Sequence, residues 1–324
     1  MWLTWRAAME RALYGDLDGQ AGFYLRERPS SHFRTSVSAA NTFARAILTL
    51  LERLDRDLGS PAVLDLVDIG AGEGRLARRV LDAAPGGLRE RLRVTAVDLS
   101  PRPDGLPEEI RWRHDLPPAM TGLAIANEWL DNIPLDVVEL TPDGPRLVLV
   151  DPDTGEERLG DPPAPADRAW LDRWWPLTRV GARAEIGRTR DAAWAAVLVR
   201  LARGQAIAID YAHPVDNRPP CGSLAGYRDG RLVAPIPDGT CDITAHVALD
   251  ACAAAGTEAG AISTELSTQR EILRELGITG TRPPIDLAHH DPRGYVRALS
   301  AAGEEAELID PHGLGAFGWL TQRR

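Results

Sequence analysis

The sequence predicts an α/β fold built on a doubly wound, mostly parallel β-sheet. Two observations favour this fold. From residue 61 onward, short apolar segments of strand length alternate with segments of helical periodicity, which is the pattern of βαβ units. Several of the apolar segments also end in an acidic residue. In an open sheet of this kind, ligands bind at the carboxyl ends of the strands, which is where these acids would lie. The expected core strands span residues 63–69, 92–97, 123–126 and 205–211.

Two additions to this sheet are expected. Residues 1–60 precede the first core strand and contain an amphipathic helix over 43–58, so we expect an N-terminal helical cap that could cover the ligand pocket. The core, residues 61–324, is interrupted over about 137–204 by short strand-like segments and a helical, tryptophan-containing patch. We expect this insertion to lie over the carboxyl edge of the sheet, with its tryptophans used for packing more readily than as a substrate cage.

The last part of the chain is expected to return to the core pattern. A helix is predicted to start near Asp242, followed by a strand over 260–264. Residues 268–271 form a capping box that opens another helix. Residues 315–320 are predicted to close the chain as an edge strand.

The composition excludes several reaction classes. The chain of 324 residues contains no lysine, so it has neither a P-loop lysine nor a Schiff-base lysine. A net charge of -10 disfavours non-specific binding of nucleic acid, which needs a basic surface. No apolar stretch is long enough to span a bilayer, and the first residues do not form a secretion signal. We therefore expect a cytoplasmic, bacterial protein without a membrane partner.

Cysteine and histidine spacing predicts neither a disulfide framework nor a metal site. Cys221, Cys241 and Cys252 include no C-x-x-C pair, and the histidines show no metal-ligand spacing. His289 and His290 adjoin in a polar segment and are predicted to lie in a solvated loop.

The most informative stretch joins the first core strand to the next helix. Asp68 ends the apolar run, and Gly70, Gly72 and Gly74 follow at alternate positions. A strand, a glycine turn and a helix N-terminus together bring backbone close to a nucleotide-like ligand. Because Arg75 stands where the dinucleotide fingerprint has its third glycine, NAD and FAD fit poorly. The arrangement resembles motif I of S-adenosylmethionine (SAM) methyltransferases; the alternative is a tight turn without a ligand.

Acidic residues near the ends of later strands complete a predicted SAM site. Asp98 is placed to accept hydrogen bonds from both ribose hydroxyls, and Asp115 to accept one from the adenine amine. Taken singly, each acid could equally be a strand-end or helix-cap residue. The residues assigned to cofactor binding are Asp68, Gly70, Gly72, Gly74, Asp98, Asp115 and Asn127.

Glu128 and Asp131 are the predicted catalytic residues. They follow strand 123–126 closely, beside the position where the SAM methyl group should project. Methyl transfer is an in-line displacement on carbon, so the enzyme mainly has to align the nucleophile and exclude water. A carboxylate there could hold a guanidinium in its bidentate fork, or accept the proton that a methylated nitrogen loses. For Asp131, a helix-start acid is an equally good explanation.

Asp210, Tyr211 and His213 are the predicted substrate-binding residues, because they follow the last parallel core strand at the same edge. The alternative is that Tyr211 and His213 only pack and form hydrogen bonds after the strand.

Several motifs together resemble the MidA family of SAM-dependent methyltransferases, and the likeness runs along most of the chain. The most family-specific is the segment at residues 127–134, N-E-W-L-D-N-I-P, which resembles "NExxDxxP". The other matching segments are residues 12–14 with 22–24 ("ALY…GYY"), 33–36 ("DFxTS"), 68–74 (the glycine motif), 209–213 ("IDYGH"), 222–228 ("GTLRxYR"), 242–247 ("DLTAHV") and 269–277 (the helix before the last strands).

The resemblance implies a Rossmann-like methyltransferase core with helical additions, and SAM as cofactor. Mitochondrial members of the family are assembly factors of respiratory complex I that methylate an arginine of one subunit. The chain departs from the family pattern in three places. Asp68 replaces a usual Glu, residues 37–39 replace "SPE", and residues 29–32 replace glycines. A different substrate is expected if the N-terminal loop binds it.

We therefore expect a SAM-dependent methyltransferase that acts on a protein, and the resemblance implies an arginine nitrogen as acceptor. One alternative is a small-molecule methyltransferase whose insertion closes an apolar pocket. Another is a non-catalytic SAM-binding assembly protein. A shallow acidic groove would favour a protein acceptor, and a sealed apolar cavity a small molecule. The sequence leaves the oligomeric state open, with a homodimer considered.

Overall fold

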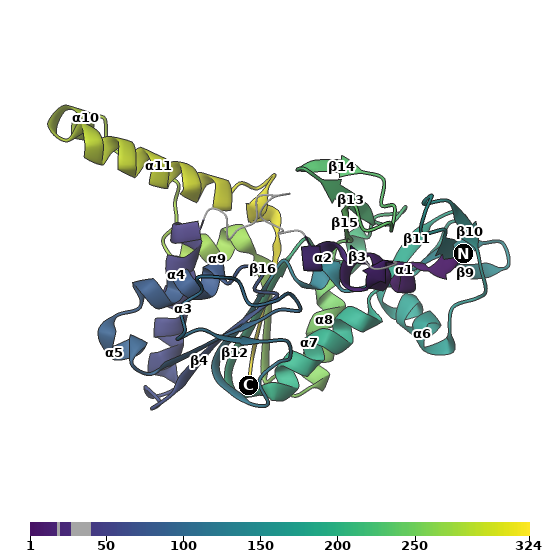
Figure 1. The fold of residues 1–324 in the computed structure, drawn as a ribbon, viewed down its shortest axis with the longest axis horizontal. Helices are drawn as coiled ribbons and strands as arrows, with labels where there is room; N and C mark the ends of the chain where they lie inside the picture. Colours follow the sequence, from purple (N-terminus) through teal and green to yellow (C-terminus); the bar gives the residue numbers. More distant parts are fainter. Residues whose placement is uncertain (18–19, 27–39) are drawn as a thin grey trace.

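The computed structural model describes residues 1–17, 20–26 and 40–324 (Figure 1). The strands of its central sheet are β4 (Leu64–Ile69), β5 (Leu92–Val97), β6 (Arg111–Arg113), β7 (Met120–Asn127), β12 (Leu201–Asp210), β16 (Ser263–Thr268) and β17 (Gly318–Arg323). Their order is β16-β17-β12-β7-β4-β5-β6. The five strands from β12 to β6 run parallel, and β17 is antiparallel to both of its neighbours. The predicted doubly wound, mostly parallel α/β sheet is confirmed.

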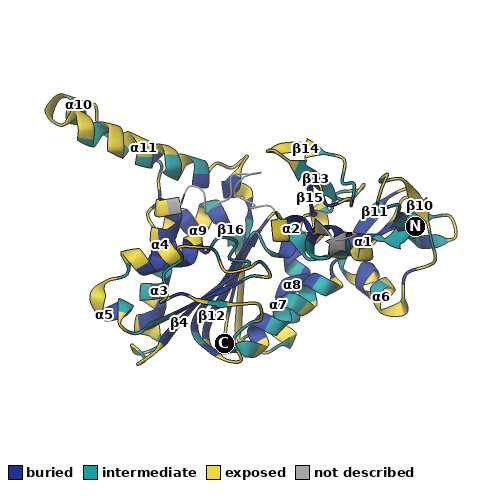
Figure 2. Cartoon of the chain, in the orientation of Figure 1, coloured by how far each residue is buried: buried dark blue, intermediate teal, exposed yellow. Residues whose placement is uncertain are grey.

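Helices cover both faces of this sheet, because successive side chains of a strand point to opposite faces. In β4, Leu64 and Leu66 join one core cluster, whereas Val67 and Ile69 join another. The first cluster lies under α3 (Ala40–Asp57), α4 (Arg75–Ala83) and α9 (Gln269–Glu275). The second lies under α7 (Arg188–Arg200) and α8 (Leu249–Glu258). Figure 2 shows the central strands buried between these helices.

A second lobe combines the start of the chain with the inserted segment. β1 (Leu3–Thr4) pairs with β9 (Gly144–Val150), and the same sheet contains β8 (Asp136–Thr141), β10 (Glu157–Leu159) and β11 (Arg183–Ile186). Helix α1 (Trp5–Tyr14) packs on this sheet and shares its core. A smaller sheet contains β13 (Ala225–Arg228), β14 (Arg231–Val233) and β15 (Asp242–Thr244). The division of the chain at residue 60 stays a prediction.

The remaining described elements are β2 (Asp16–Leu17), β3 (Gln20–Ala21), α2 (Phe23–Arg26), α5 (Gly86–Arg89), α6 (Pro165–Trp174), α10 (Asp286–His290) and α11 (Pro292–Leu308), with 3-10 helices η2 (Leu130–Asn132), η3 (Val215–Asn217) and η4 (Leu314–Ala316). The motif-like segment at 33–36 and the departures at 29–32 and 37–39 lie outside the described residues. Within the ranges described, no helix combines the length and apolarity needed to cross a bilayer.

Two expectations for the last part of the chain are wrong because tertiary contacts replace local ones. Asp242 begins strand β15 and not a helix, since its carboxylate is buried and accepts hydrogen bonds from Tyr24 and Asn132. The next helix begins at Leu249. Strand β17 is interior, not an edge, because it pairs with both β12 and β16.

The local signals around residues 260–292 give a mixed result. The capping box is present, with Thr268 and Glu271 each accepting from the other's backbone N–H. The strand before it runs over Ser263–Thr268, a few residues later than expected. His289 and His290 are exposed, but they lie in helix α10 and not in a loop.

The central strands approach one another closely at two glycines. Gly122 in β7 has φ 144°, and a Cβ there would collide with the Asp65 carbonyl oxygen of β4. A Cβ at Gly204 in β12, where φ is 135°, would collide with the Gly122 carbonyl oxygen. The packing of β4, β7 and β12 therefore requires glycine at both positions.

We predict that Gly122→Ala lowers the free energy of unfolding by about 2–4 kcal/mol, because it combines backbone strain with a steric clash. Urea unfolding followed by circular dichroism measures this change in the free energy of unfolding. Gly87→Ala in α5 is the control, since an added Cβ there meets no atom within 4 Å and the φ is not positive. An unchanged unfolding midpoint for Gly122→Ala would contradict the prediction.

Candidate functional site

The glycine turn between β4 and α4 has the backbone geometry of a ligand-binding loop. Gly70, Gly72 and Gly74 have φ values of 69°, 54° and 68°. A Cβ at Gly70 would lie 2.8 Å from Trp129 Cδ1, and one at Gly74 would lie 2.9 Å from Leu106. A Cβ at Gly72 would meet no described atom within 4 Å. Two glycines thus allow close packing, and the middle one faces open space at a helix N-terminus.

Asp98, at the end of β5, holds this turn directly. Its Oδ2 accepts a hydrogen bond from the Gly72 N–H at 2.8 Å. Its Oδ1 accepts from the backbone N–H of Ser100 at 2.8 Å and from the Ser100 hydroxyl at 2.6 Å. Asp115 is exposed and follows β6, the strand next to β5. The structure therefore brings Asp98 to the glycine turn and places Asp115 beyond the adjacent strand end.

Asp68 lies below the turn and is directed at helix α4. Its Oδ2 accepts a hydrogen bond from the Ala77 N–H at 3.2 Å. Burial, with a smaller contribution from the nearby charge of Asp98, raises the pKa of Asp68 to about 7. This carboxyl contacts the helix start, so it would influence a cofactor through the shape of the turn. Its assignment to cofactor binding stays a prediction.

Asn127 and Glu128 end strand β7 next to this turn. Glu128 has φ 53°, a left-handed conformation that is uncommon for a residue with a side chain. Its N–H donates to the Ile209 carbonyl oxygen at 2.8 Å, which fixes it against β12. Asn127 Nδ2 donates to Glu128 Oε1 at 2.9 Å, while Asn127 Oδ1 is buried with no hydrogen-bond partner among the described residues. The strained backbone and the paired amide fix the direction of the Glu128 carboxylate.

Asp131 and Asp210 form a buried acid pair beside Glu128. Asp210 Oδ2 accepts from the N–H groups of Leu130 at 2.9 Å and Asp131 at 3.3 Å. Asp131 Oδ2 accepts from the Thr244 hydroxyl at 2.8 Å. In both acids, Oδ1 is buried and lacks a partner within the described part of the chain. Burial raises the pKa of both carboxyls, and the charge of Asp131 raises the pKa of Asp210 further, so the pair favours retaining a proton.

Arg190 is a buried residue of this region that sequence reasoning missed. Its guanidinium donates to the carbonyl oxygens of Asp131 at 2.5 Å, Ala245 at 2.8 Å and His246 at 2.9 Å. It thereby ties η2 to the segment after β15, and its charge lowers the pKa values of the two acids. An available signal was that Arg190 and Trp194 lie four residues apart on the buried face of α7.

A second missed group links the start of the chain to the acids. The Tyr24 hydroxyl donates to Asp242 Oδ1 at 2.6 Å, and Asn132 Nδ2 donates to the same oxygen at 3.0 Å. Tyr14 stacks on Tyr24, with ring centroids 5.6 Å apart, and donates to the Asn132 carbonyl oxygen at 3.2 Å. Burial raises the pKa of Asp242 to about 7. These residues lie in segments that resemble the family motifs, but no local pattern predicted that they meet.

Tyr211 and His213 lie in different surroundings. Tyr211 is partly exposed and stacks on His246, with ring centroids 5.5 Å apart. His213 is buried, and Arg218 contacts its Nδ1 at 2.7 Å. Burial, followed by the charge of Arg218, lowers the pKa of His213 to about 3, so the imidazole is neutral near pH 7. Trp175 packs edge-on against it at 4.7 Å. Of the three predicted residues, only Asp210 joins the acid pair. His213 Nε2 is buried with no hydrogen-bond partner among the described residues, and the assignment of Tyr211 and His213 to substrate binding stays a prediction.

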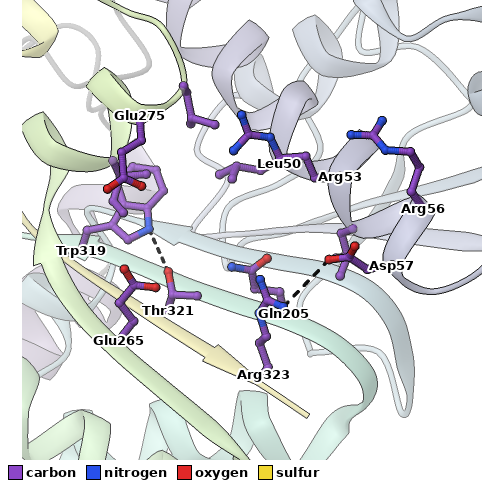
Figure 3. A pocket seen from close by; sticks show the side chains of 13 residues that line it. Leu50, Arg53, Arg56, Asp57, Gln205, Glu265, Glu275, Trp319, Thr321 and Arg323 are labelled. Carbon is purple, nitrogen blue, oxygen red and sulfur yellow. Dashed lines mark hydrogen bonds and ion pairs between the residues drawn. The ribbon is translucent and has the colours of Figure 1, made fainter.

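A cavity of about 300 Å³ lies elsewhere, between α3, α9 and the sheet (Figure 3). Its lining includes Leu50, Gln205, Trp319 and Arg323, and none of the predicted site residues. Gln205 pairs with Arg323 near the start of β12, which is the amino edge of the parallel strands. This cavity is therefore separate from the glycine turn. Over the same described ranges, no group of three or more His, Cys, Asp or Glu side chains could hold a metal ion.

The buried Asp242 predicts a pH dependence of stability. Its pKa is about 7 in the folded chain and near 4 when unfolded, so the folded state keeps a proton that the unfolded state has lost. Stability should therefore fall as the pH rises from about 4 to 7. Asp242→Asn removes this contribution. The free energy of unfolding of the variant should therefore fall less between pH 5 and pH 8 than that of the native chain, and the two falls should differ by on the order of 2 kcal/mol.

Urea unfolding at pH 5 and pH 8 checks this difference, with Asp104→Asn in an exposed loop as the control. Equal pH dependence of the Asp242→Asn variant and the native chain would show that the Asp242 carboxyl is ionised in the folded state.

Comparison with known proteins identifies the relatives of this fold. Residues 42–267 match the model of a family described as "Putative S-adenosyl-L-methionine-dependent methyltransferase". A Burkholderia thailandensis protein, described as a likely methyl transferase and bound to S-adenosyl-homocysteine, is 28% identical, with 100% of this chain and 88% of that chain covered and a TM-score of 0.81. A native structure of an uncharacterized protein of the same superfamily and organism is 29% identical, with coverages of 100% and 87% and a TM-score of 0.80. No curated protein matches.

The family match spans more than half of the chain, and the first of these structures contains the product that SAM leaves after methyl transfer. The chain therefore belongs to this family of SAM-dependent methyltransferases, and SAM is its cofactor.

Proposed function

We propose that the chain methylates a nitrogen atom of a protein acceptor, and that the acceptor is the arginine side chain implied by the resemblance to the MidA family. The observation that carries the proposal is the set of buried acceptor oxygens beside Glu128. Asn127 Oδ1, Asp131 Oδ1 and Asp210 Oδ1 are buried, and none has a hydrogen-bond partner within the described ranges. Unpaired buried acceptors are rare, and a cation rich in N–H donors would satisfy them.

The residues at the glycine turn suit the SAM that this family uses. The open space at Gly72 lets the ligand approach the backbone next to the N-terminus of α4. Asp98 is fixed at the turn by Gly72 and Ser100, where its carboxylate could accept from ribose hydroxyls. We assign adenine recognition to Asp115, and an orienting role to Asn127 through its contact with Glu128.

Bound SAM supplies a methyl group on a positively charged sulfur, and this sulfur is the leaving group when the acceptor nitrogen bonds to the methyl carbon. Glu128 would hold the guanidinium by its N–H groups and accept the proton released as the nitrogen becomes methylated. Asp131 and Asp210 would hold the acceptor through their unpaired oxygens, and their raised pKa values favour a protonated carboxyl while the site is empty. Trp129 lies against Gly70, so the end of β7 is held close to the cofactor turn.

Gly72→Leu should lower SAM affinity by at least about 100-fold, because its side chain would fill the space left for the ligand. Isothermal titration calorimetry measures the SAM affinity of each variant. Gly59→Leu is the matched control, since Gly59 also has a positive φ, 77°, with no atom within 4 Å of an added Cβ. Similar losses in both variants, or retained affinity in Gly72→Leu, would contradict the assignment of the turn.

Glu128→Gln should reduce turnover by about 10²–10⁴-fold while SAM affinity stays within about threefold, because the amide cannot accept the proton. The purified native chain or variant is incubated with labelled SAM and lysate from a strain that lacks the gene. The rate of labelling is measured, and the labelled product is identified by mass spectrometry. The exposed Glu108→Gln serves as the control. Label on a protein arginine supports the proposal. Label confined to metabolites would favour a small-molecule acceptor, and SAM binding without any labelled product would favour a non-catalytic role.

A further inference from the structure

Helices α10 and α11 form an arm that projects from the body of the molecule, away from the second lobe (Figure 1). Helix α11 has 17 residues and is therefore about 25 Å long. Ala302 and Leu308, both near its C-terminal end, are its buried residues, and this end packs near α3, α9 and η4. The remainder of the arm is largely exposed in Figure 2. An isolated helix of this length is marginal in water, so its exposed surface requires an explanation.

One face of α11 is apolar and exposed from Val296 to Ala306. Val296 is 64% exposed and Leu299 is 40% exposed, in the outer half. Gly303 and Ala306 continue the same face in the inner half and are also exposed. Gly280 lies to one side of Ala306, where a Cβ on Gly280 would be 3.1 Å from Ala306 Cα. A Cβ added to Gly303 would meet no described atom within 4 Å. The face therefore has two large side chains at one end and two small residues at the other.

The charges beside this face are also divided between the two halves. Arg293 and Arg297 lie in the outer, N-terminal half, and Glu304 and Glu307 lie on the same flank in the inner half. No basic residue lies in the last turn, and Asp291 precedes the helix as its N-cap. Beyond that cap, basic groups near the N-terminus and acidic groups near the C-terminus oppose the helix dipole. Arg297 offsets part of this effect, because it lies 3.9 Å from Asp291 Oδ2 of its own chain.

We propose that this face of α11 binds the same face of α11 in a second copy of the chain, antiparallel and related by a two-fold axis level with residues 300–302. In that arrangement Val296 and Leu299 of each copy pack on Gly303 and Ala306 of the other. Arg297 of each copy lies beside Glu304 of the other, and Arg293 lies near Glu307. Both size and charge are thus self-complementary only in the antiparallel orientation.

The size of the face determines how tight the dimer is. A helix pair about 25 Å long buries less than the roughly 800 Å² per partner of a standard interface. We therefore expect a dimer that dissociates on dilution. Glu304 also lies near Arg79 of its own chain, so its charge is partly balanced in the monomer.

Sedimentation velocity of the full chain over a range of concentrations tests the proposal. The native chain should dimerise, and Val296→Glu with Leu299→Glu should remain monomeric. Leu232→Glu is the matched control, because Leu232 is 69% exposed but lies on β14. Its dissociation constant should equal that of the native chain. A native chain that is monomeric throughout, or a dimer that survives the double substitution, would overturn the proposal.

A charge exchange tests the orientation. Arg297→Glu and Glu304→Arg should each raise the dissociation constant at least about tenfold, because each places like charges together twice across the two-fold axis. A 1:1 mixture of the two variants should recover native affinity, since both pairs are then of opposite sign. Failure of the mixture to associate, with both variants folded by circular dichroism, would exclude the antiparallel pairing.

Discussion

The contact between Gly70 and Trp129 is the constraint on which the rest of the site depends. A Cβ at residue 70 would lie 2.8 Å from the indole Cδ1, so only glycine lets the ends of β4 and β7 come this close. On one side of the contact lie the glycine turn and Asp98; on the other lie Glu128 and the buried acids. A methyl donor and its acceptor have to meet within a few ångströms, and in the proposed mechanism this packing would set their separation.

Burial explains the chemistry of the acidic half. Asp131 and Asp210 are kept from water by the core, which raises the pKa of both carboxyls and favours a protonated form. Arg190 limits this effect without forming an ion pair with either carboxylate, because its guanidinium is used by backbone carbonyl groups. The result is a rigid site with acceptor atoms left unpaired, an arrangement that costs stability and is common where a protein binds a ligand.

Local signals were enough to predict the sheet, the glycine turn and the acids at its carboxyl edge. Strand β4 and helix α4 follow from the spacing of apolar residues, and parallel strands necessarily bring Asp98 and Glu128 to one edge. The pairing of β1 with β9, the meeting of Tyr24 with Asp242, and the role of Arg190 depend on contacts between segments far apart in sequence. Periodicity and capping rules contain no information about such pairings, which is also why the capping signal at Asp242 predicts a helix where the structure has a strand.

The interior position of β17 has a consequence for the order in which the chain can fold. This strand separates β12 from β16, although it is made after both of them. Until residues 318–323 leave the ribosome, β12 and β16 each have a free hydrogen-bonding edge, and such edges can pair with other chains. Completion of the sheet therefore waits for this strand, and a nascent chain stalled shortly before it would be a natural client of chaperones.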